Sequence, residues 1–207
     1  MTAEKKRKIA RVLSFIVIIA GVTVIIGWIF NIEILKSISP SWVSMKFDTA
    51  ISFLLSGIVI YSITKVQEGE FDKAQIIISI TSLIIILLMG ILFFSTLFRI
   101  HTGLENLFIS ETAGGVKTVV PGRPSIPTMI NFILIAVSGI LSIGNLEKVH
   151  KKLKIIGITI GIIGALAVIG YIINISFLYY YIKGVNSAMA CHTAILFVLL
   201  GIGLICL

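Results

Sequence analysis

Charged residues are scarce in this chain. Only 13% of its 207 residues are Asp, Glu, Lys or Arg, whereas 57% are hydrophobic and the mean hydropathy is +1.12. A soluble globular domain carries about 25% charged residues, because water must solvate its surface. The shortage therefore excludes a water-soluble globule and predicts a protein whose main partner is the lipid bilayer.

Cysteine is also rare, and common catalytic motifs are missing. Cys191 and Cys206 fall on one predicted helix, about 22 Å apart at a rise of 1.5 Å per residue, so they cannot form a disulfide with each other. The sequence contains no glycine-rich phosphate loop, no His-Glu-x-x-His and no Gly-x-Ser-x-Gly. We therefore expect no catalytic residues, and no cofactor is indicated. A nucleic-acid partner is not expected, because it would need a basic soluble face.

Long apolar runs take the place of the missing polar residues. Roughly 20 apolar residues cross a bilayer, and uncharged or nearly uncharged runs of that order occur six times. The fold predicted is all-α and polytopic, with residues 1–207 forming one domain of six transmembrane helices. Trp28 is typical of a membrane–water interface, and Ser44 is placed to cap the second helix. The predicted spans are 12–31, 47–64, 74–98, 125–145, 155–176 and 187–207.

The distribution of basic residues predicts the orientation. The first apolar run is longer than the roughly 7 to 15 residues of a cleaved signal, which favours a retained anchor behind a charged tail, residues 1–11. With the N-terminus inside, eleven of the 17 Lys and Arg are cytoplasmic, as the positive-inside rule favours. Six spans return the C-terminus to the cytoplasm, and we expect a multi-pass plasma-membrane protein. The eleven are Lys5, Lys6, Arg7, Lys8, Arg11, Lys65, Lys73, Lys148, Lys151, Lys152 and Lys154.

An internal repeat organises the chain. Residues 45–57, MKFDTAISFLLSG, align with residues 189–201, MACHTAILFVLLG, and both follow a similar apolar helix. Residues 127–139, PTMINFILIAVSG, form a degenerate middle copy. The sequence therefore predicts three helix-hairpin repeats, roughly 9–66, 72–146 and 151–207. Gly157 and Gly161 have the spacing that lets membrane helices pack closely.

The repeat gathers polar residues at one level of the bundle. It stacks Asp48 with His192, and Thr49 with Asn131 and Thr193. Polar groups at membrane depth tend to face the bundle interior or a wet cavity, so we expect an extracytoplasmic pocket in which Asp48 and His192 pair. Met45, Met189 and His101 are further candidate ligand-binding residues. Two plainer interpretations remain: Asp48 as a carboxylate that the helix dipole favours, and simple packing with satisfied hydrogen bonds.

A metal site is a weaker alternative at the same place. Met189, Cys191 and His192 offer soft and imidazole ligands suited to Cu(I) or Zn. However, Cys191 and His192 are adjacent on a helix and point about 100° apart. The extracytoplasmic loop 99–124, the longest of the chain, is predicted to act as a lid over the pocket, because long loops in compact proteins are often functional.

The paired pattern resembles the six-helix integral membrane sensor domains that precede PAS, histidine kinase or diguanylate cyclase modules in prokaryotic signalling proteins, including two-component systems. It rests on Met45, Thr49-Ala50, Phe53 and Gly57, and on their counterparts from Met189 to Gly201. The middle unit departs from the pattern with Ile130-Asn131-Phe132. The resemblance implies a sensor that relays a stimulus through the sixth helix to a cytoplasmic signalling module, in cis or in trans, with a homodimer as one arrangement.

The apolar end at Leu207 is expected if this chain is part of a longer polypeptide. A small transporter or channel is the rival function, because repeats with midplane sites are common in transporters. A structural subunit of a larger membrane complex is a third interpretation, and it predicts a lateral face covered by partner helices.

Overall fold

The computed structural model describes residues 2–112, 114–144 and 146–207, and in these ranges the regular structure is helical. An isolated β-bridge joins Ile182 to Asn186. The helices are α1 (Ala3–Ile29), α2 (Glu33–Lys36), α3 (Phe47–Val66), α4 (Phe71–Phe98), η1 (Leu104–Asn106), α5 (Ile126–Ile143), α6 (Leu146–Ile172), η2 (Ser176–Tyr179) and α7 (Cys191–Ile205).

Five helices, α1, α3, α4, α5 and α6, are long and apolar enough to cross a membrane, and α7 is a shorter apolar helix. Large hydrophobic side chains remain exposed on the outward faces, for example Ile80, Leu87 and Phe94 of α4. A helix whose exposed face is apolar is stable where lipid, not water, surrounds it. The chain is therefore an α-helical, multi-pass membrane protein.

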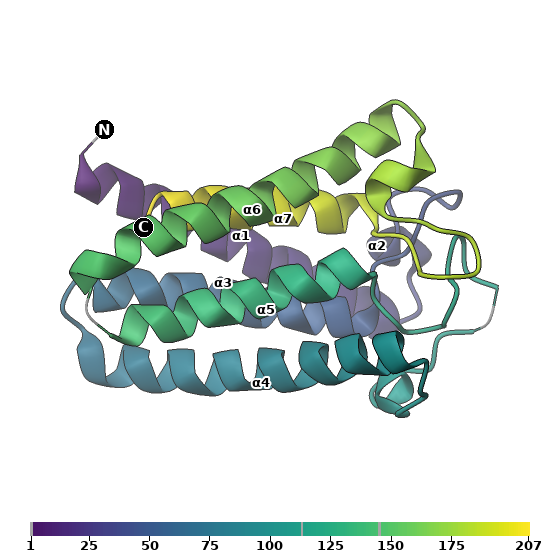
Figure 1. Ribbon diagram of the computed structural model, residues 1–207, viewed down its shortest axis with the longest axis horizontal. Coiled ribbons are helices and arrows are strands. Elements are labelled where there is room, and N and C mark those ends of the chain that lie inside the picture. The colour runs from purple at the N-terminus through teal and green to yellow at the C-terminus, as the bar shows by residue number, and fades with distance from the viewer. Residues whose placement is uncertain (1, 113, 145) are drawn as a thin grey trace.

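The long helices lie side by side in one bundle (Figure 1). Closely packed pairs are formed by α1 with α3, by α4 with α5, and by α6 with α7, while α3 also contacts α4, α5 and α7. Both chain termini lie at one end of the bundle, which we call the terminal end. The connections 30–46, 99–125 and 173–190 form the opposite end, which we call the loop end.

Three phenylalanines occupy the centre of the bundle. Phe53 of α3, Phe132 of α5 and Phe197 of α7 are fully buried, and their ring centroids lie 4.8 to 5.0 Å apart. Tilted and edge-on contacts at this distance are the preferred arrangement of aromatic rings. The rings join α3, α5 and α7 into one core.

Glycine sets the close approach within two of the helix pairs. A Cβ atom on Gly57 would stand 2.8 Å from the carbonyl oxygen of Ser14, and one on Gly201 would stand 2.6 Å from the carbonyl oxygen of Gly157. Neither position has room for a side chain. Gly161 also lies against Gly201, which confirms the packing role predicted for the Gly157–Gly161 spacing.

α3 begins at Phe47, as predicted, whereas the other long helices and α7 begin at different residues from those predicted. α1 begins at Ala3, because Thr2 Oγ1 accepts a hydrogen bond from the Lys5 backbone, so the basic leader is helical and not a separate tail. α7 begins only at Cys191, and residues 187–190 have no helical structure. The prediction for Ser44 was wrong: Lys46 precedes α3 and makes no side-chain cap, while Ser44 donates to Glu111 at 3.4 Å.

Candidate functional site

Three long helices end at the loop end in the same way. Asn31, Arg99 and Asn174 follow α1, α4 and α6, and each adopts the left-handed conformation, with φ of 55°, 55° and 57°. The next backbone N–H then bonds a carbonyl five residues back, as from Ile32 to Gly27 at 2.7 Å and from Ile175 to Gly170 at 2.9 Å. Such closures satisfy the last carbonyls of a helix and turn the chain sharply.

Matching aromatic donors fix the chain that enters α3 and α7. Trp28 Nε1 donates to the Met45 carbonyl at 2.8 Å, and the Tyr171 hydroxyl donates to the Met189 carbonyl at 2.8 Å. Each bond ties the loop end of one helix to the segment that begins its neighbour. The two methionine segments are therefore held at the same level of the bundle.

The structure brings together four of the residues predicted for the ligand site. Met45, Thr49, Met189 and Thr193 line a common cavity with Thr128 of α5. Its volume is only about 10 Å³, which holds one water molecule at most. This part of the predicted pocket is closed by packing.

Asp48 and His192 do not pair as predicted. Oδ2 of Asp48 and both ring nitrogens of His192 are buried and make no hydrogen bond with the described residues. Asp48 lies in the electrostatic range of Glu105, whereas the imidazole of His192 lies beside the backbone of Lys36. The two helices present equivalent positions to different neighbouring loops, which separates the carboxylate from the imidazole.

The remaining predicted residues are scattered. Asn131 is fully buried, and neither polar atom of its amide has a partner among the described residues. His101 is exposed near Glu105 and lines neither the small cavity nor the larger pocket described below. Cys191 is buried at the start of α7. In the described ranges, no cluster of three or more His, Cys, Asp and Glu is close enough to hold a metal ion.

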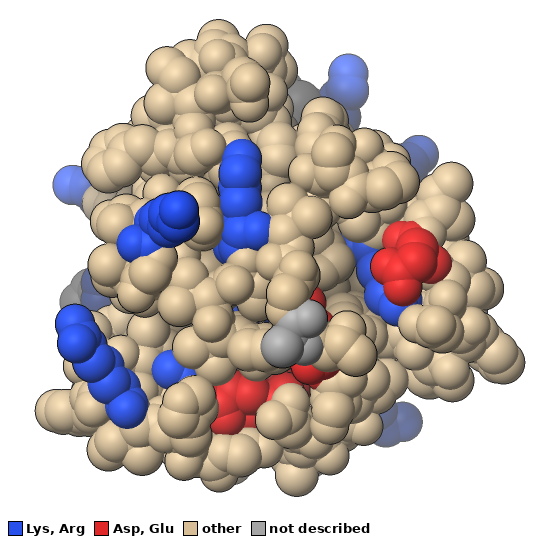
Figure 2. Space-filling model, turned by 90° about the vertical axis from the view of Figure 1, so that its right-hand side faces the viewer, with Lys and Arg blue, Asp and Glu red and all other residues tan. Residues whose placement is uncertain are grey.

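A larger pocket opens at the loop end, and we call it the tryptophan pocket. Its volume is about 650 Å³, a size typical of small-molecule sites. Its lining includes one aromatic ring from α1, a second ring, a buried lysine and a carboxylate from the first connection, and another carboxylate from residues 109–112. Figure 2 shows acidic and basic side chains on this end of the molecule, surrounded by uncharged surface. The aromatic and charged lining residues are Trp28, Trp42, Lys36, Glu33 and Glu111.

Lys36 is the buried cation of this pocket, with 4% of the residue exposed. Its Nζ donates to Asn31 Oδ1 and to Glu33 Oε1, both at 2.7 Å, and lies 4.8 Å from the centre of the Trp28 ring. A cation over an indole face is stabilised by the ring quadrupole. The contacts hold the Trp28 ring and the ammonium group in fixed positions on the pocket wall.

Glu111 connects the pocket to α3. Its Oε1 accepts from Lys46 Nζ at 2.5 Å, and its Oε2 accepts from the Gly122 backbone at 2.6 Å. Lys46 Nζ also donates to Thr118 Oγ1 at 2.9 Å. Burial lowers the pKa of the Lys46 ammonium, and the Glu111 carboxylate acts in the opposite direction. The long loop 99–124 is thereby anchored to the residue that precedes α3.

Trp42 connects the pocket to α7. Its ring centre lies 5.1 Å from that of Tyr171 on α6, and the Tyr171 hydroxyl bonds Met189, two residues before α7. Two direct contacts therefore link Trp42 to the segment that begins α7.

A second polar cluster anchors the loop near α4. The guanidinium of Arg123 is paired with Glu105 and donates to Ser95 Oγ at 2.7 Å and to the Ile100 carbonyl at 3.0 Å. Burial alone raises the pKa of the Glu105 carboxyl. The hydrogen bond and the positive charge of Arg123 have the larger combined effect with the backbone, and the pKa of Glu105 lies below its ordinary range. The cluster closes the loop over the end of α4.

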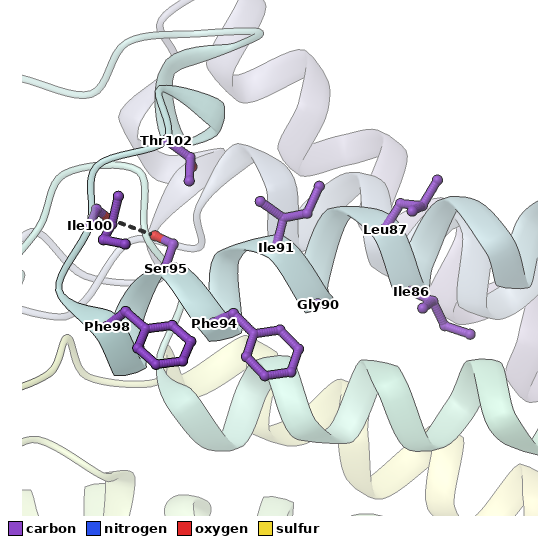
Figure 3. A pocket seen from close by; sticks show the side chains of 9 residues that line it. All are labelled: Ile86, Leu87, Gly90, Ile91, Phe94, Ser95, Phe98, Ile100 and Thr102. Atoms are coloured by element: carbon purple, nitrogen blue, oxygen red, sulfur yellow. Dashed lines mark hydrogen bonds between the residues drawn. The ribbon is translucent and has the colours of Figure 1, made fainter.

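An apolar groove of about 410 Å³ runs along the part of α4 nearest the loop end. Figure 3 shows Phe94 and Phe98 beside it, with Ser95 donating to the Ile100 carbonyl at 2.9 Å. A Cβ atom on Gly90 would meet nothing within 4 Å, so this glycine does not mark a helix contact within the chain. The groove lies on the lipid-facing surface and offers almost no polar group.

Trp42, Lys36 and Glu111 were not singled out by sequence reasoning. Trp28 was assigned to the membrane interface, and its pocket role follows only once the first connection folds back over it. The one signal available was the length of loop 99–124, which predicted a lid, and residues 109–112 and 114–116 of that loop line the tryptophan pocket. Protein-family models, curated proteins and solved structures contain no match to this chain.

Proposed function

We propose that this chain is the membrane-embedded sensor, or input, domain of a signal-transduction protein. The tryptophan pocket binds the stimulus, and α7 passes the change to a cytoplasmic signalling module, in cis or in trans. The observation that carries the proposal is the chain of contacts from Trp42 to Tyr171 to Met189. It gives a pocket of ligand size a direct mechanical connection to the helix that ends at the opposite end of the bundle.

The proposal includes six membrane spans arranged as three hairpins, with both termini in the cytoplasm and the loop end outside. α7 is short, but it packs among α6, α1 and α3. The matching contacts of Trp28 and Tyr171, and of Gly57 and Gly201, support equivalent first and third hairpins. The excess of Lys and Arg expected on the terminal side supports the orientation.

The lining of the tryptophan pocket favours a small amphipathic ligand. Trp28 and Trp42 provide apolar area, while Lys36, Glu33 and Glu111 provide charges of both signs. A ligand that contacts Glu111 competes for the carboxylate that holds Lys46, and a ligand that moves Trp42 acts on Tyr171. The stimulus shifts the equilibrium only if it binds one of the two conformations more tightly than the other.

In this scheme Asp48, Thr49, Asn131, His192 and Thr193 belong to the moving layer beneath the ligand. The unpartnered polar atoms of Asp48, Asn131 and His192 leave this layer without bonds that would favour a single arrangement. A buried polar group without a hydrogen-bond partner raises the free energy of the present arrangement. A small helix displacement that gives the group a partner recovers part of that free energy.

Tryptophan fluorescence tests the binding step, because Trp28 and Trp42 are the only tryptophans of the chain and both line the pocket. The chain in lipid nanodiscs would be titrated with phenethylamine, phenylacetate and related small amphipathic molecules. We expect a saturable change in emission with at least one of them. No saturable change across the panel would contradict the pocket assignment.

A fusion of the chain to a histidine kinase module tests the relay. Trp42→Ala is expected to retain basal autophosphorylation and to lose the response to the ligand found by fluorescence. Phe94→Ala, which alters the lipid-facing groove of α4, is the matched control and is expected to keep the response. An unchanged response in Trp42→Ala would remove the proposed route to α7.

The structure gives less support to the transporter alternative. Phe53, Phe132 and Phe197 fill the centre of the bundle with contacting rings, and the small cavity above them holds one water at most. Substrate uptake into proteoliposomes would reverse this preference.

A further inference from the structure

A groove of about 560 Å³ lies at the terminal end, far from the tryptophan pocket. Segments distant in sequence form it: the first turns of α1, the turn after α3, the first turns of α6 and the end of α7. Figure 1 shows the starts of α1 and α6 and the C-terminus at this same end. We call it the basic groove, because its charged lining residues are Lys6, Arg7, Lys151 and Lys154, with His150 beside them.

The charged side chains that line the basic groove are all positive. Among the described residues that line it there is no Asp or Glu. Nor does any ion pair among the described residues involve Lys6, Arg7, Lys151 or Lys154. Four cations gathered in a concave site create a field that attracts an anion.

Nearby cations outside the groove behave differently. Arg11 pairs with Glu68, and Lys65 pairs with Glu70 at 2.8 Å. Arg7 also interacts electrostatically with Glu68. However, Oε1 of Glu68 accepts a hydrogen bond from Arg11. The acidic residues of the turn after α3 are thus occupied by partners outside the groove.

Arg7 lines the groove and has one N–H group without an acceptor among the described residues. Its Nη1 donates to the Gln67 carbonyl at 3.0 Å, which fixes the guanidinium against the turn after α3. Its Nε is buried and makes no hydrogen bond with the described residues. A buried N–H of a charged group costs free energy when it has no acceptor, and an anion in the groove would provide one.

We propose that the basic groove binds a phosphate group. The planar fork of Arg7 suits phosphate oxygens, and the flexible lysines of α1 and α6 complete the charge neutralisation. Ile205 and Cys206 at the end of α7 give the groove an apolar side, as expected where a bundle meets the headgroup layer of a bilayer. Basic pockets between membrane helices are known binding sites for anionic lipid headgroups.

Two sources supply this chemistry: the headgroup of an anionic phospholipid and a soluble phosphate compound. Occupancy by either joins α1, α6 and α7, because a single phosphate would contact side chains of α1 and α6 and lie against the end of α7. The site is independent of the tryptophan pocket, so its presence or absence leaves the proposed stimulus site untouched.

Two triple variants with equal charge test the proposal. Lys6→Gln/Lys151→Gln/Lys154→Gln removes three lysines that line the groove. Lys5→Gln/Lys8→Gln/Lys152→Gln removes three exposed lysines from the same segments that do not line it. Both variants lose the same attraction to an anionic surface, so a difference between them reports the groove. Arg7 is kept in both, because it also bonds the turn after α3.

Binding of phosphatidylglycerol would be measured by native mass spectrometry after release from phosphatidylcholine nanodiscs that contain it. Binding of inorganic phosphate would be measured by calorimetry in nanodiscs of phosphatidylcholine alone. We expect the groove variant to lose roughly tenfold in affinity relative to the matched variant in at least one arm. A loss in the first arm alone identifies the lipid headgroup, and a loss in the second identifies a soluble phosphate.

Equal affinity of the two triple variants in both arms, or no binding by the unaltered chain in either, would overturn the proposal. Thermal unfolding and tryptophan emission of each variant would be recorded in the same nanodiscs. If the groove variant were unfolded, the single variant Lys154→Gln, on the exposed face of α6, would be compared with Lys152→Gln, and equal phosphate affinity of that pair would count against the groove.

Discussion

Two ion pairs at the loop end of the bundle are buried, whereas the ion pairs at the terminal end are exposed to a larger extent. At the loop end, the Lys46–Glu111 pair exposes 3% and 7% of its side chains, and the Arg123–Glu105 pair 6% and 3%. At the terminal end, the Arg11–Glu68 pair exposes 33% and 31%. Buried pairs fix one arrangement because breaking them leaves an uncompensated charge, whereas exposed pairs exchange readily with water and with other ions. The buried pairs thus hold the loop end in one geometry, whereas the charged side chains of the terminal end can exchange their partners for water or other ions.

The largest expected effect comes from breaking the buried pair that joins the long loop to α3. Glu111→Gln leaves the Lys46 ammonium buried without its counter-ion, and we expect the free energy of unfolding to fall by about 3–5 kcal/mol. Titration with sodium dodecyl sulfate in detergent micelles measures it. The double variant Lys46→Met/Glu111→Leu removes both charges and should recover most of the loss. A decrease below about 1 kcal/mol, the range of an exposed pair, would show that the buried pair stabilises the fold no more than the exposed pairs of the terminal end.

Acid is expected to loosen the second buried pair. The pKa of Glu105 lies below its ordinary range in the folded protein, so the ionised pair stabilises the fold above about pH 4.3, and this stability is lost as the pH falls through the lower folded value. A hydrogen bond to a charged group contributes roughly 1.5–3 kcal/mol. Thermal unfolding of the unaltered chain and of Glu105→Gln would be compared at pH 7 and pH 3. The gap between them should narrow at pH 3, and a constant gap would argue against this linkage.

The smallest effect is expected at the terminal end. Arg11→Gln removes the exposed partner of Glu68 and should change the free energy of unfolding by only about 0.2–1 kcal/mol. Salt should reduce the difference further, because exposed charges are screened within about 10 Å at 0.1 M ionic strength. Unfolding in low and high salt checks both points. A large, salt-insensitive loss would show that the terminal end is as firmly built as the loop end.

The sequence predicted the helical membrane class because long apolar runs have few other stable structures. It also predicted that Thr49 and Thr193 meet, because similar residues at matched positions of similar helices reach the same level of a bundle. Both threonines line the small cavity, but Asn131, which the repeat aligned with them, does not.

The ion pairs of the loop end were beyond sequence reasoning for a physical reason. Lys46 and Glu111 are 65 residues apart, and Glu111 lies in a connection that has no periodic pattern. The pairing of Asp48 with His192 was wrong because the repeat aligns positions along helices without fixing which neighbour each face meets. Sequence reasoning assigned no pocket role to Trp42, because a single tryptophan in a loop belongs to no periodic pattern.

The three contacting rings of Phe53, Phe132 and Phe197 have an electrical consequence. Ions keep their hydration shells, and a constriction filled by aromatic side chains excludes the water on which those shells depend. The rings come from α3, α5 and α7 and are fully buried. We therefore expect planar bilayers containing the protein to show the same conductance as bare lipid.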